Sequence, residues 1–155
     1  MEIIFVRHGK SEKREETLTD LSRHLTEKGK KKVQKSMNKL NKKLEPIGER
    51  EIKLWSSPAD RALETAEIIS SAIHKEINNV FDFIYGGSFE ALQGEVKKMT
   101  NESTLFIIGH EPILSEWIEQ ITGDQLKMRK GQIINVQVNN DSLSDGKVEW
   151  IIDPK

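Results

Sequence analysis

Short apolar runs alternate along the chain with longer segments in which apolar residues recur every three or four positions. The runs predict strands at residues 3–6, 52–55, 105–108, 133–138 and 148–152, and a strand or an extended segment at 80–85. The runs at 3–6 and 105–108 are continuously apolar, which is typical of strands that are buried on both faces of a sheet.

The amphipathic segments predict four helices. The first begins after a capping hydroxyl at Thr26 and continues to Leu44, and its apolar stripe consists of Val33, Met37, Leu40 and Leu44. The second begins at Ser57-Pro58, where a capping hydroxyl precedes a proline, and continues to Ile73. Two shorter helices are expected at residues 89–99 and 112–121.

Strands that alternate with helices predict an α/β fold, a three-layer α/β/α sandwich around a mainly parallel central sheet. The last two strands are joined by a turn-rich segment and are expected to form a hairpin, which gives the sheet an antiparallel edge strand. The stretch at residues 10–25 is too charged and aperiodic to predict a helix. A length of 155 residues suits a single domain over residues 1–155.

Composition narrows the class of protein. The net charge of −1 argues against a nucleic-acid partner, which usually requires a strongly basic surface. The absence of cysteine excludes disulfides and thiolate nucleophiles. The apolar run at residues 3–6 is too short for a signal peptide, and no segment reaches the roughly 20 apolar residues that span a membrane. A cytoplasmic protein with no membrane partner is therefore expected.

Polar side chains follow three of the predicted strands directly. His8 follows the first strand, Ser57 the second and His110 the strand at 105–108. In parallel sheets, ligands bind beyond the carboxyl ends of the strands. The sequence therefore predicts that these three residues, which are far apart in the chain, converge at one edge of the sheet.

Arg7-His8-Gly9 carries a candidate nucleophile. A neutral imidazole, with an ordinary pKa of about 6.5, can attack phosphorus at neutral pH. The planar guanidinium of Arg7 matches phosphate oxygens, and Gly9 lets the backbone pass close to a ligand. Taken alone, a histidine after a strand is more often structural.

Arg61 and His110 occupy two further junctions between a strand and a helix. Arg61 lies in the first turns of the predicted second helix, where free N–H groups already favour an anion. The alternative is a surface arginine paired with Asp60 or Glu64. His110 is suited to stabilise charge on a phosphoryl group, or it is a capping or core histidine.

The combination resembles the motifs of the histidine phosphatase superfamily, which includes the phosphoglycerate mutases. The matching segments, in the family order, are Phe5-Val6-Arg7-His8-Gly9-Lys10-Ser11, Leu25-Thr26-Glu27-Lys28-Gly29, Ser56-Ser57-Pro58-Ala59-Asp60-Arg61-Ala62-Leu63-Glu64-Thr65-Ala66 and Ile107-Ile108-Gly109-His110. The short chain without long insertions is most similar to the SixA branch of phosphohistidine phosphatases.

The resemblance implies a phosphoglycerate mutase-like fold and a phosphatase that needs no cofactor. It implies that His8 is the nucleophile and that Arg7, Arg61 and His110 bind the phosphate. Arg23 matches a basic position of the SixA type, although a solvated arginine is the alternative. The substrate is then a phosphohistidine-bearing protein or, alternatively, a small phosphate ester, and a third possibility is a module that binds phosphate without turnover.

The sequence does not identify a general acid clearly. Glu111 stands where one branch of the family has an acid, and a helix-capping carboxylate is an equally good interpretation. Glu12, Glu90 and Glu102 are weaker candidates. Expulsion of an imidazole needs less assistance from an acid than expulsion of an alkoxide, because its conjugate acid has a pKa of about 6.5. A weak acid therefore favours P–N substrates.

Three other features have plain interpretations. His24 and His74 lack companions at ligand spacing, so no metal site is expected. The lysine-rich segment at 28–43 is either a solvated helix face or, less favoured, a docking site for an acidic protein. Tyr85-Gly86-Gly87 is either a plain turn or a loop at the rim of the active site.

Overall fold

A computed structural model describes residues 1–15, 19–48 and 50–154. Within these residues the chain forms one six-stranded sheet in the order β3-β2-β4-β1-β5-β6. The strands are β1 (Glu2–Arg7), β2 (Ile52–Ser56), β3 (Asn79–Val80), β4 (Thr104–Gly109), β5 (Ile133–Gln137) and β6 (Lys147–Ile152). The helices are α1 (Glu27–Leu44), α2 (Asp60–Ile73), α3 (Asp82–Gly86), α4 (Phe89–Val96) and α5 (Ile113–Thr122), with short 3-10 turns at Asp20–Ser22 and Glu45–Ile47.

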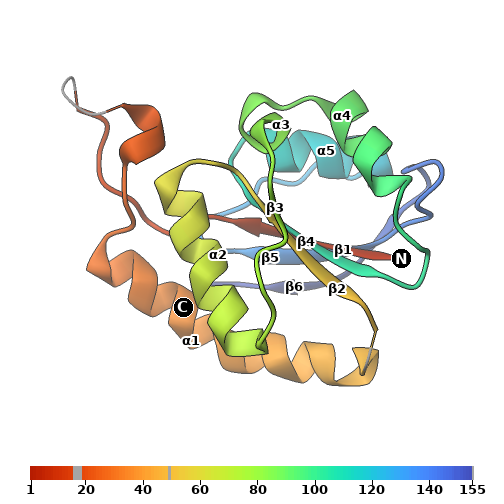
Figure 1. Cartoon of the computed structure of the whole chain (residues 1–155), viewed down its shortest axis with the longest axis horizontal. Coiled ribbons are helices and arrows are strands. Elements are labelled where there is room, and N and C mark those ends of the chain that lie inside the picture. Colours follow the sequence, from red (N-terminus) through yellow and green to blue (C-terminus); the bar gives the residue numbers. More distant parts are fainter. Residues whose placement is uncertain (16–18, 49, 155) are drawn as a thin grey trace.

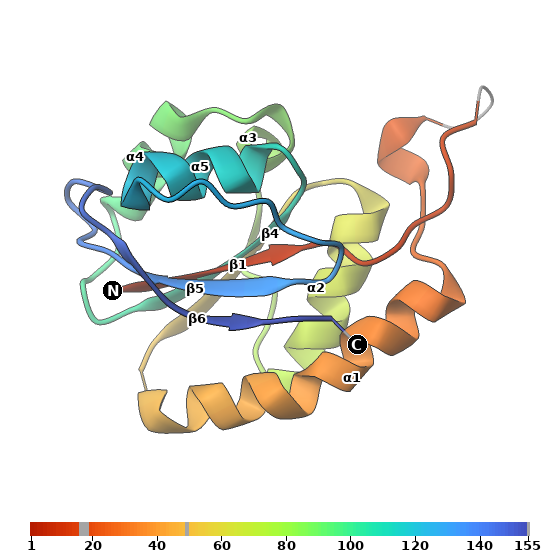
Figure 2. The same ribbon diagram turned by 180° about the vertical axis from the view of Figure 1, so that it is seen from behind.

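Helices cover both faces of the sheet. The helices α1 and α2 lie on one face, and α3, α4 and α5 lie on the other (Figures 1 and 2). Alternate residues of β1 supply the two cores, because successive side chains of a strand point to opposite faces. Ile3 and Phe5 pack toward α5, whereas Ile4 and Val6 pack toward α1 and α2. The expected three-layer α/β/α sandwich is confirmed.

The central strands are parallel. Strand β4 pairs in parallel with β1 on one side and with β2 on the other, and β3 pairs in parallel with β2. Strand β5 runs antiparallel to β1, and β6 runs antiparallel to β5 at the edge of the sheet, as the predicted terminal hairpin requires. The carboxyl ends of β2, β4 and β1 therefore lie side by side.

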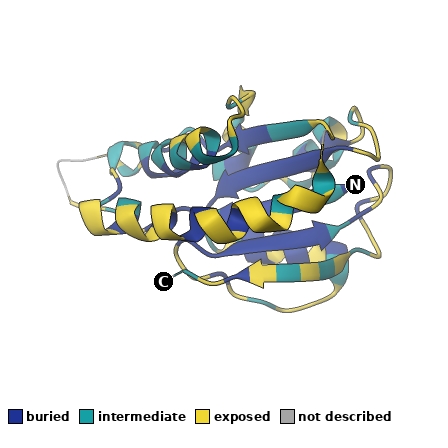
Figure 3. Ribbon diagram, turned by 90° about the horizontal axis from the view of Figure 1, so that it is seen from below, coloured by how far each residue is buried: buried dark blue, intermediate teal, exposed yellow. Residues whose placement is uncertain are grey.

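The first helix is as predicted. The Thr26 side chain accepts a hydrogen bond from the Gly29 N–H at 3.0 Å and so caps α1. Val33, Met37 and Leu40 are buried, and the lysines lie on the exposed face, which is yellow in Figure 3. The lysines thus form an exposed helix face, which is compatible with both interpretations of this segment.

The prediction of a strand or an extended segment at residues 80–85 is correct for Val80 and for Phe81, whose backbone is extended, and wrong from Asp82 onward. Strand β3 ends at Val80, and Asp82–Gly86 forms the short helix α3. The helical turn places Ile84 in the core, where it is fully buried, and the Phe81 and Phe83 rings stack at 4.8 Å between centroids. An extended backbone would instead point Phe81 and Phe83 to one side and Ile84 to the other.

The start of the second helix also differs from the prediction. Helix α2 begins at Asp60, and its N-cap residue, Ala59, has no side-chain hydrogen bond. The Ser57 N–H donates to the Ile108 carbonyl at 3.0 Å, which holds the serine at the end of the sheet. Helix α4 likewise ends at Val96, before the predicted residue 99, because the chain turns there.

Among the described residues, no helix is long and apolar enough to cross a membrane. 

Candidate active site

His8 lies at the carboxyl end of β1 and is 6% exposed. Its backbone N–H donates to the Gly109 carbonyl at 3.0 Å, which joins it to the end of β4. Its Nδ1 lies 2.7 Å from the Gly9 carbonyl oxygen. Because a carbonyl oxygen can only accept, Nδ1 carries the hydrogen, and the lone pair of the neutral ring is on Nε2.

Both histidines of the site are neutral at pH 7. Burial lowers the pKa of His8 to about 3; the Gly9 hydrogen bond opposes this shift, and the neighbouring His110, Arg61 and Arg7 add to it. Burial also lowers the pKa of His110 to about 4, with Arg61 again contributing. A neutral imidazole is the form that can act as a nucleophile.

Thr65 connects the loop of His8 to α2. Its hydroxyl accepts a hydrogen bond from the Gly9 N–H at 3.2 Å and donates to the Arg61 carbonyl at 2.8 Å. A Cβ atom on Gly9 would lie 2.9 Å from a methyl group of Val33. The backbone at position 9 therefore passes so close to α1 that only glycine fits without a shift. Thr65 was not identified from the sequence, since a buried threonine on a helix gives no local signal of this contact.

Arg61 is the second residue of α2 and is 4% exposed. Its Nη1 donates to the Asp20 backbone carbonyl at 2.6 Å, and its Nη2 donates to the Asp20 carboxylate at 3.0 Å. The alternative of a surface pair with Glu64 is wrong, because the Glu64 carboxylate accepts instead from the Leu25 N–H at 2.7 Å. Arg61 is thus buried and directed toward the site.

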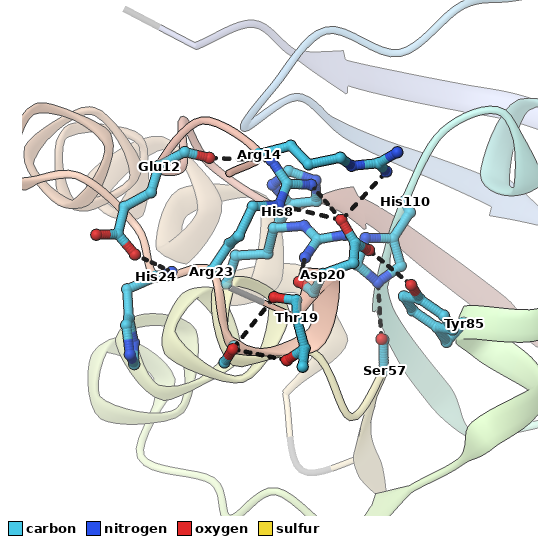
Figure 4. Close-up of polar contacts among 12 residues, drawn as sticks. His8, Glu12, Arg14, Thr19, Asp20, Arg23, His24, Ser57, Tyr85 and His110 are labelled. Carbon is cyan, nitrogen blue, oxygen red and sulfur yellow. Dashed lines mark hydrogen bonds and ion pairs between the residues drawn. The ribbon is translucent and has the colours of Figure 1, made fainter. Parts of the chain in front are cut away.

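His110 follows β4 directly. Its Nε2 lies 2.7 Å from the Ser57 hydroxyl, which connects the ends of β4 and β2. The ring centroid lies 5.2 Å from that of His8 and 5.4 Å from that of Tyr85. The three residues expected to converge at the carboxyl edge, His8, Ser57 and His110, are therefore in mutual proximity (Figure 4).

A cavity of about 600 Å³ opens at this edge of the sheet. All six residues predicted for the site line it: Arg7, His8, Arg23, Arg61, His110 and Glu111. The Arg23 side chain is 16% exposed and donates to Asp20 and to the Glu12 carbonyl, so it is not a solvated arginine. The structure thus brings together residues from β1, from the 3-10 turn, from α2 and from the end of β4.

Three nitrogen atoms at this cavity are buried and have no hydrogen-bond partner: Arg7 Nε, Arg61 Nε and His110 Nδ1. Arg7 is anchored by its Nη1, which donates to the Met128 carbonyl at 2.8 Å. Buried polar groups normally have partners, and an unpartnered one is costly. Two guanidinium groups with unpartnered nitrogens beside a neutral histidine form a site that suits an anion such as a phosphoryl group.

Glu111 lines the cavity, but its carboxylate is engaged elsewhere. One oxygen accepts from the Ser115 N–H at 3.0 Å, and the other accepts from the Ser115 hydroxyl and from the Met128 N–H. These contacts hold the start of α5, as a capping carboxylate does. Of the two interpretations of Glu111, this geometry favours the cap.

The other candidate acids contribute less. Glu12 lines the cavity, but its carboxylate accepts from the His24 N–H at 2.8 Å. Glu90 lies on α4, and Glu102 lies in the turn before β4, at the opposite edge of the sheet. Neither is among the residues that line the cavity.

Asp20 and Tyr85 both line the cavity. Asp20 was not identified from the sequence, and for Tyr85 a place at the rim was one of two interpretations. The Tyr85 hydroxyl donates to the Asp20 carboxylate at 2.6 Å, although the two residues are 65 positions apart. The interpretation of Tyr85-Gly86-Gly87 as part of the rim is therefore correct for Tyr85, which is helical. Asp20 lies in an aperiodic charged stretch, where nothing distinguishes it from its neighbours.

Among the described residues, no group of three or more histidine, aspartate or glutamate side chains is placed to hold a metal ion. 

Comparison with known families gives an independent view of these residues. A model described as the histidine phosphatase superfamily (branch 1) matches residues 3–102. The matched segment includes His8, Arg23 and Arg61, and it ends before His110.

Individual relatives extend the match over the chain. An uncharacterized protein of Picosynechococcus sp. strain PCC 7002 is 31% identical over 144 residues, which cover 88% of this chain and 85% of the relative. The structure of the protein histidine phosphatase SixA complexed with tungstate has a TM-score of 0.82, at 20% identity and covering 98% of this chain and 96% of that one. The alpha-ribazole phosphatase from Shigella flexneri has a TM-score of 0.67, at 14% identity and covering 96% and 95%. At such identities the two structures show a shared fold.

Proposed function

The chain belongs to the histidine phosphatase superfamily (branch 1), and from this premise we propose that it is a phosphatase that acts through a phosphohistidine on His8. The observation that carries the proposal is the state of His8. A buried, neutral imidazole is held by its Nδ1–H on the Gly9 carbonyl, next to the guanidinium groups of Arg7 and Arg61.

The reaction proceeds in two steps at this site. The Nε2 lone pair of His8 attacks phosphorus, and the new P–N bond forms as the bond to the leaving group breaks. A phosphohistidine that is already protonated on its other ring nitrogen leaves as neutral imidazole and takes up no further proton, whereas an alkoxide would need a proton from an acid. Water then attacks phosphorus, the P–N bond to His8 breaks, and inorganic phosphate leaves with His8 neutral again. Arg7, Arg61 and Arg23 stabilise the charge on the phosphoryl oxygens in both steps.

His110 stabilises the same oxygens as a hydrogen-bond donor. Its Nε2 contacts the Ser57 hydroxyl, and its Nδ1 is buried without a partner. A neutral imidazole carries one hydrogen, so Ser57 must donate to Nε2 if Nδ1 is to carry the hydrogen that a phosphoryl oxygen accepts. Ser57 thereby selects the tautomer of His110 that can donate to a phosphoryl group.

We further propose that the substrate is a phosphohistidine-bearing protein. Among the described residues that line the cavity, the carboxylates of Glu12, Asp20 and Glu111 all accept hydrogen bonds, so none of the three is free to act as an acid beside His8. An alkoxide leaving group needs such an acid, whereas protonated phosphohistidine expels neutral imidazole, whose conjugate acid has a pKa of about 6.5. The likeness in fold to the protein histidine phosphatase SixA supports the same choice.

The test compares phosphate release from a phosphohistidine-bearing protein with release from a simple alkyl phosphate. We expect the P–N substrate to be strongly preferred, and Glu111→Gln to leave its turnover within about threefold of the wild type. The control is Ser115→Ala, which removes a hydrogen bond to the same carboxylate but keeps the carboxylate itself.

A preference for the alkyl ester, with a large loss in Glu111→Gln but not in Ser115→Ala, would instead make the protein a small-molecule phosphomonoesterase with Glu111 as its acid. Binding of both substrates without phosphate release would make it a phosphate-binding module.

A further inference from the structure

Asp20 has an unusual set of partners for a carboxylate. One oxygen, Oδ2, accepts from the Tyr85 hydroxyl at 2.6 Å and from Arg61 Nη2 at 3.0 Å. The other oxygen, Oδ1, accepts from Arg23 Nε at 3.0 Å, and Arg23 Nη2 lies 2.8 Å from it. Arg14 Nη2 is also 3.3 Å from Oδ1. Three guanidinium groups and one hydroxyl thus converge on a single anion (Figure 4).

These donors line the cavity that we assign to phosphate. The other two carboxylates among its described lining residues are engaged differently, since Glu12 accepts from the His24 N–H, and Glu111 accepts from Ser115 and Met128. The Asp20 carboxylate is therefore the negative charge in direct contact with the guanidinium groups of the cavity. Burial raises its pKa, but the hydrogen bonds from Tyr85, Arg61 and Arg23 and the charge of Arg61 together outweigh burial and hold the pKa well below its usual range.

We propose that Asp20 is a resident anion of the phosphate pocket, which shares Arg23 and Arg61 with the phosphoryl group and limits how tightly the pocket holds inorganic phosphate. The proposal rests on the proposed function only in assigning phosphate to this cavity. A pocket with several guanidinium groups and no counter-charge would bind the dianionic product tightly and release it slowly. The negative charge of Asp20 opposes a second anion nearby, so product can leave.

Substitution by asparagine separates charge from architecture at this position. The Asp20 backbone carbonyl accepts from Arg61 Nη1, and this hydrogen bond is retained in Asp20→Asn. The Arg61 side chain is only 5% exposed, so we expect its position to be kept in the variant. The asparagine oxygen can still accept from Tyr85 or from a guanidinium group. Asp20→Asn therefore removes one negative charge while most of the pocket keeps its arrangement.

The test measures the equilibrium binding of inorganic phosphate by calorimetry at pH 7 and fixed ionic strength. We expect Asp20→Asn to bind phosphate about tenfold more tightly than the wild type, because one like charge is removed a few ångströms from the ligand. Inhibition of turnover by added phosphate should become stronger in the same proportion. A merely structural role for Asp20 predicts the opposite sign, since loss of an anchor can only weaken binding.

Two controls make the result specific. Asp153→Asn removes a carboxylate that also pairs with an arginine, at 2.8 Å from Arg129 Nη2, but Asp153 does not line the cavity. The Asp153→Asn protein should bind phosphate with the same affinity as the wild type. Arg61→Ala in the Asp20→Asn background should abolish the tighter binding, which localises the ligand to the pocket.

The outcomes separate this proposal from the proposed function. If the wild type binds phosphate and Asp20→Asn binds it equally or more weakly, Asp20 is not a resident anion, and the phosphatase assignment is unaffected. If neither protein binds phosphate or its analogue tungstate, the assignment of phosphate to the cavity fails, and the role of Asp20 fails with it. 

Discussion

The two ends of β1 hold polar side chains in opposite ways. At the amino end, the Glu2 carboxylate accepts from Gln137 Nε2 at 3.0 Å and from Thr104 Oγ1 and Asn135 Nδ2, both at 3.3 Å. At the carboxyl end, Arg7 and His8 face a cavity beside Arg61 and other cationic side chains. The six-residue strand β1 therefore connects two different polar clusters. The side chains at its amino end bind one another, whereas those at its carboxyl end line a cavity.

The difference is visible in the buried polar atoms. Among the described residues, four buried side-chain nitrogen or oxygen atoms lack a partner, and three of them belong to Arg7, Arg61 and His110 at the carboxyl end. The fourth, Asn135 Oδ1, belongs to an amide whose nitrogen already binds Glu2. Mutually satisfied groups stabilise a fold, whereas buried donors without partners mark the place for a ligand. Substitutions at the two ends should accordingly affect different measurements.

The largest effect is expected for His8→Ala at the carboxyl end. Because the substitution removes the nucleophile, turnover should fall by at least about 1,000-fold, while the thermal midpoint of unfolding stays close to that of the wild type. Phosphate release and thermal melting on the same samples would check this. The matched control is His74→Asn, which replaces an exposed histidine at the end of α2 that lies outside the cavity. Turnover near the wild-type value in His8→Ala would exclude the phosphohistidine mechanism.

An intermediate effect on the free energy of unfolding is expected when the pH is lowered. The pKa of His8 is about 3 and that of His110 about 4 in the folded protein, both below the ordinary value of 6.5, and burial is the main cause. Below pH 6.5 the unfolded chain therefore binds more protons, and the free energy of unfolding falls as the pH decreases. Each histidine should contribute a loss of roughly 2 kcal/mol between pH 7 and pH 5.

Urea unfolding at pH 7 and at pH 5 measures this loss. His8→Gln lacks one of the two titrating groups, so its stability should depend less on pH than that of the wild type. Curves with the same pH dependence in both proteins would show that the buried imidazole of His8 does not control acid stability.

The smallest effect is expected for Glu2→Gln at the amino end. The glutamine keeps an oxygen that can accept but loses the charge that receives the hydrogen bonds from Gln137 and Asn135, so the free energy of unfolding should fall by about 1 kcal/mol. Turnover should not change, because Glu2 lies at the opposite end of β1 from His8. Chemical unfolding and a turnover assay on one preparation would check both. A loss of activity at unchanged stability would contradict the division between the two ends.

Much of the fold was predictable because its pattern is local. The continuous apolar run of β1 is typical of a strand buried on both faces, and the apolar stripe of α1 repeats at the period of a helix. Both elements were confirmed. The prediction of an extended segment failed from Asp82 to Tyr85, because this stretch is short and rich in aromatic residues, a composition that suits a strand and a buried helical turn equally. There the core position of Ile84 decided the backbone conformation.

The site was predictable to the extent that it follows strand ends. His8 and His110 come directly after β1 and β4, and parallel pairing of neighbouring strands places them together. The sequence left open whether Glu111 is an acid or a cap, because that depends on where Ser115 and Met128 lie. It gave no sign of Asp20, whose partners come from α2, from α3 and from its own loop.

The sequence alone therefore determined most of the elements, the layered fold and the meeting of His8, Ser57 and His110 at the carboxyl edge, since apolar periodicity and parallel pairing are properties of short segments. Only the tertiary structure decided which polar groups satisfy one another. Hydrogen bonds between residues 40 or more positions apart, such as those of Asp20 with Arg61 and Tyr85, depend on directions and distances of a few ångströms that no local pattern encodes. The same holds for the shorter-range contacts of Glu111 with Ser115 and Met128, which decide between a cap and an acid.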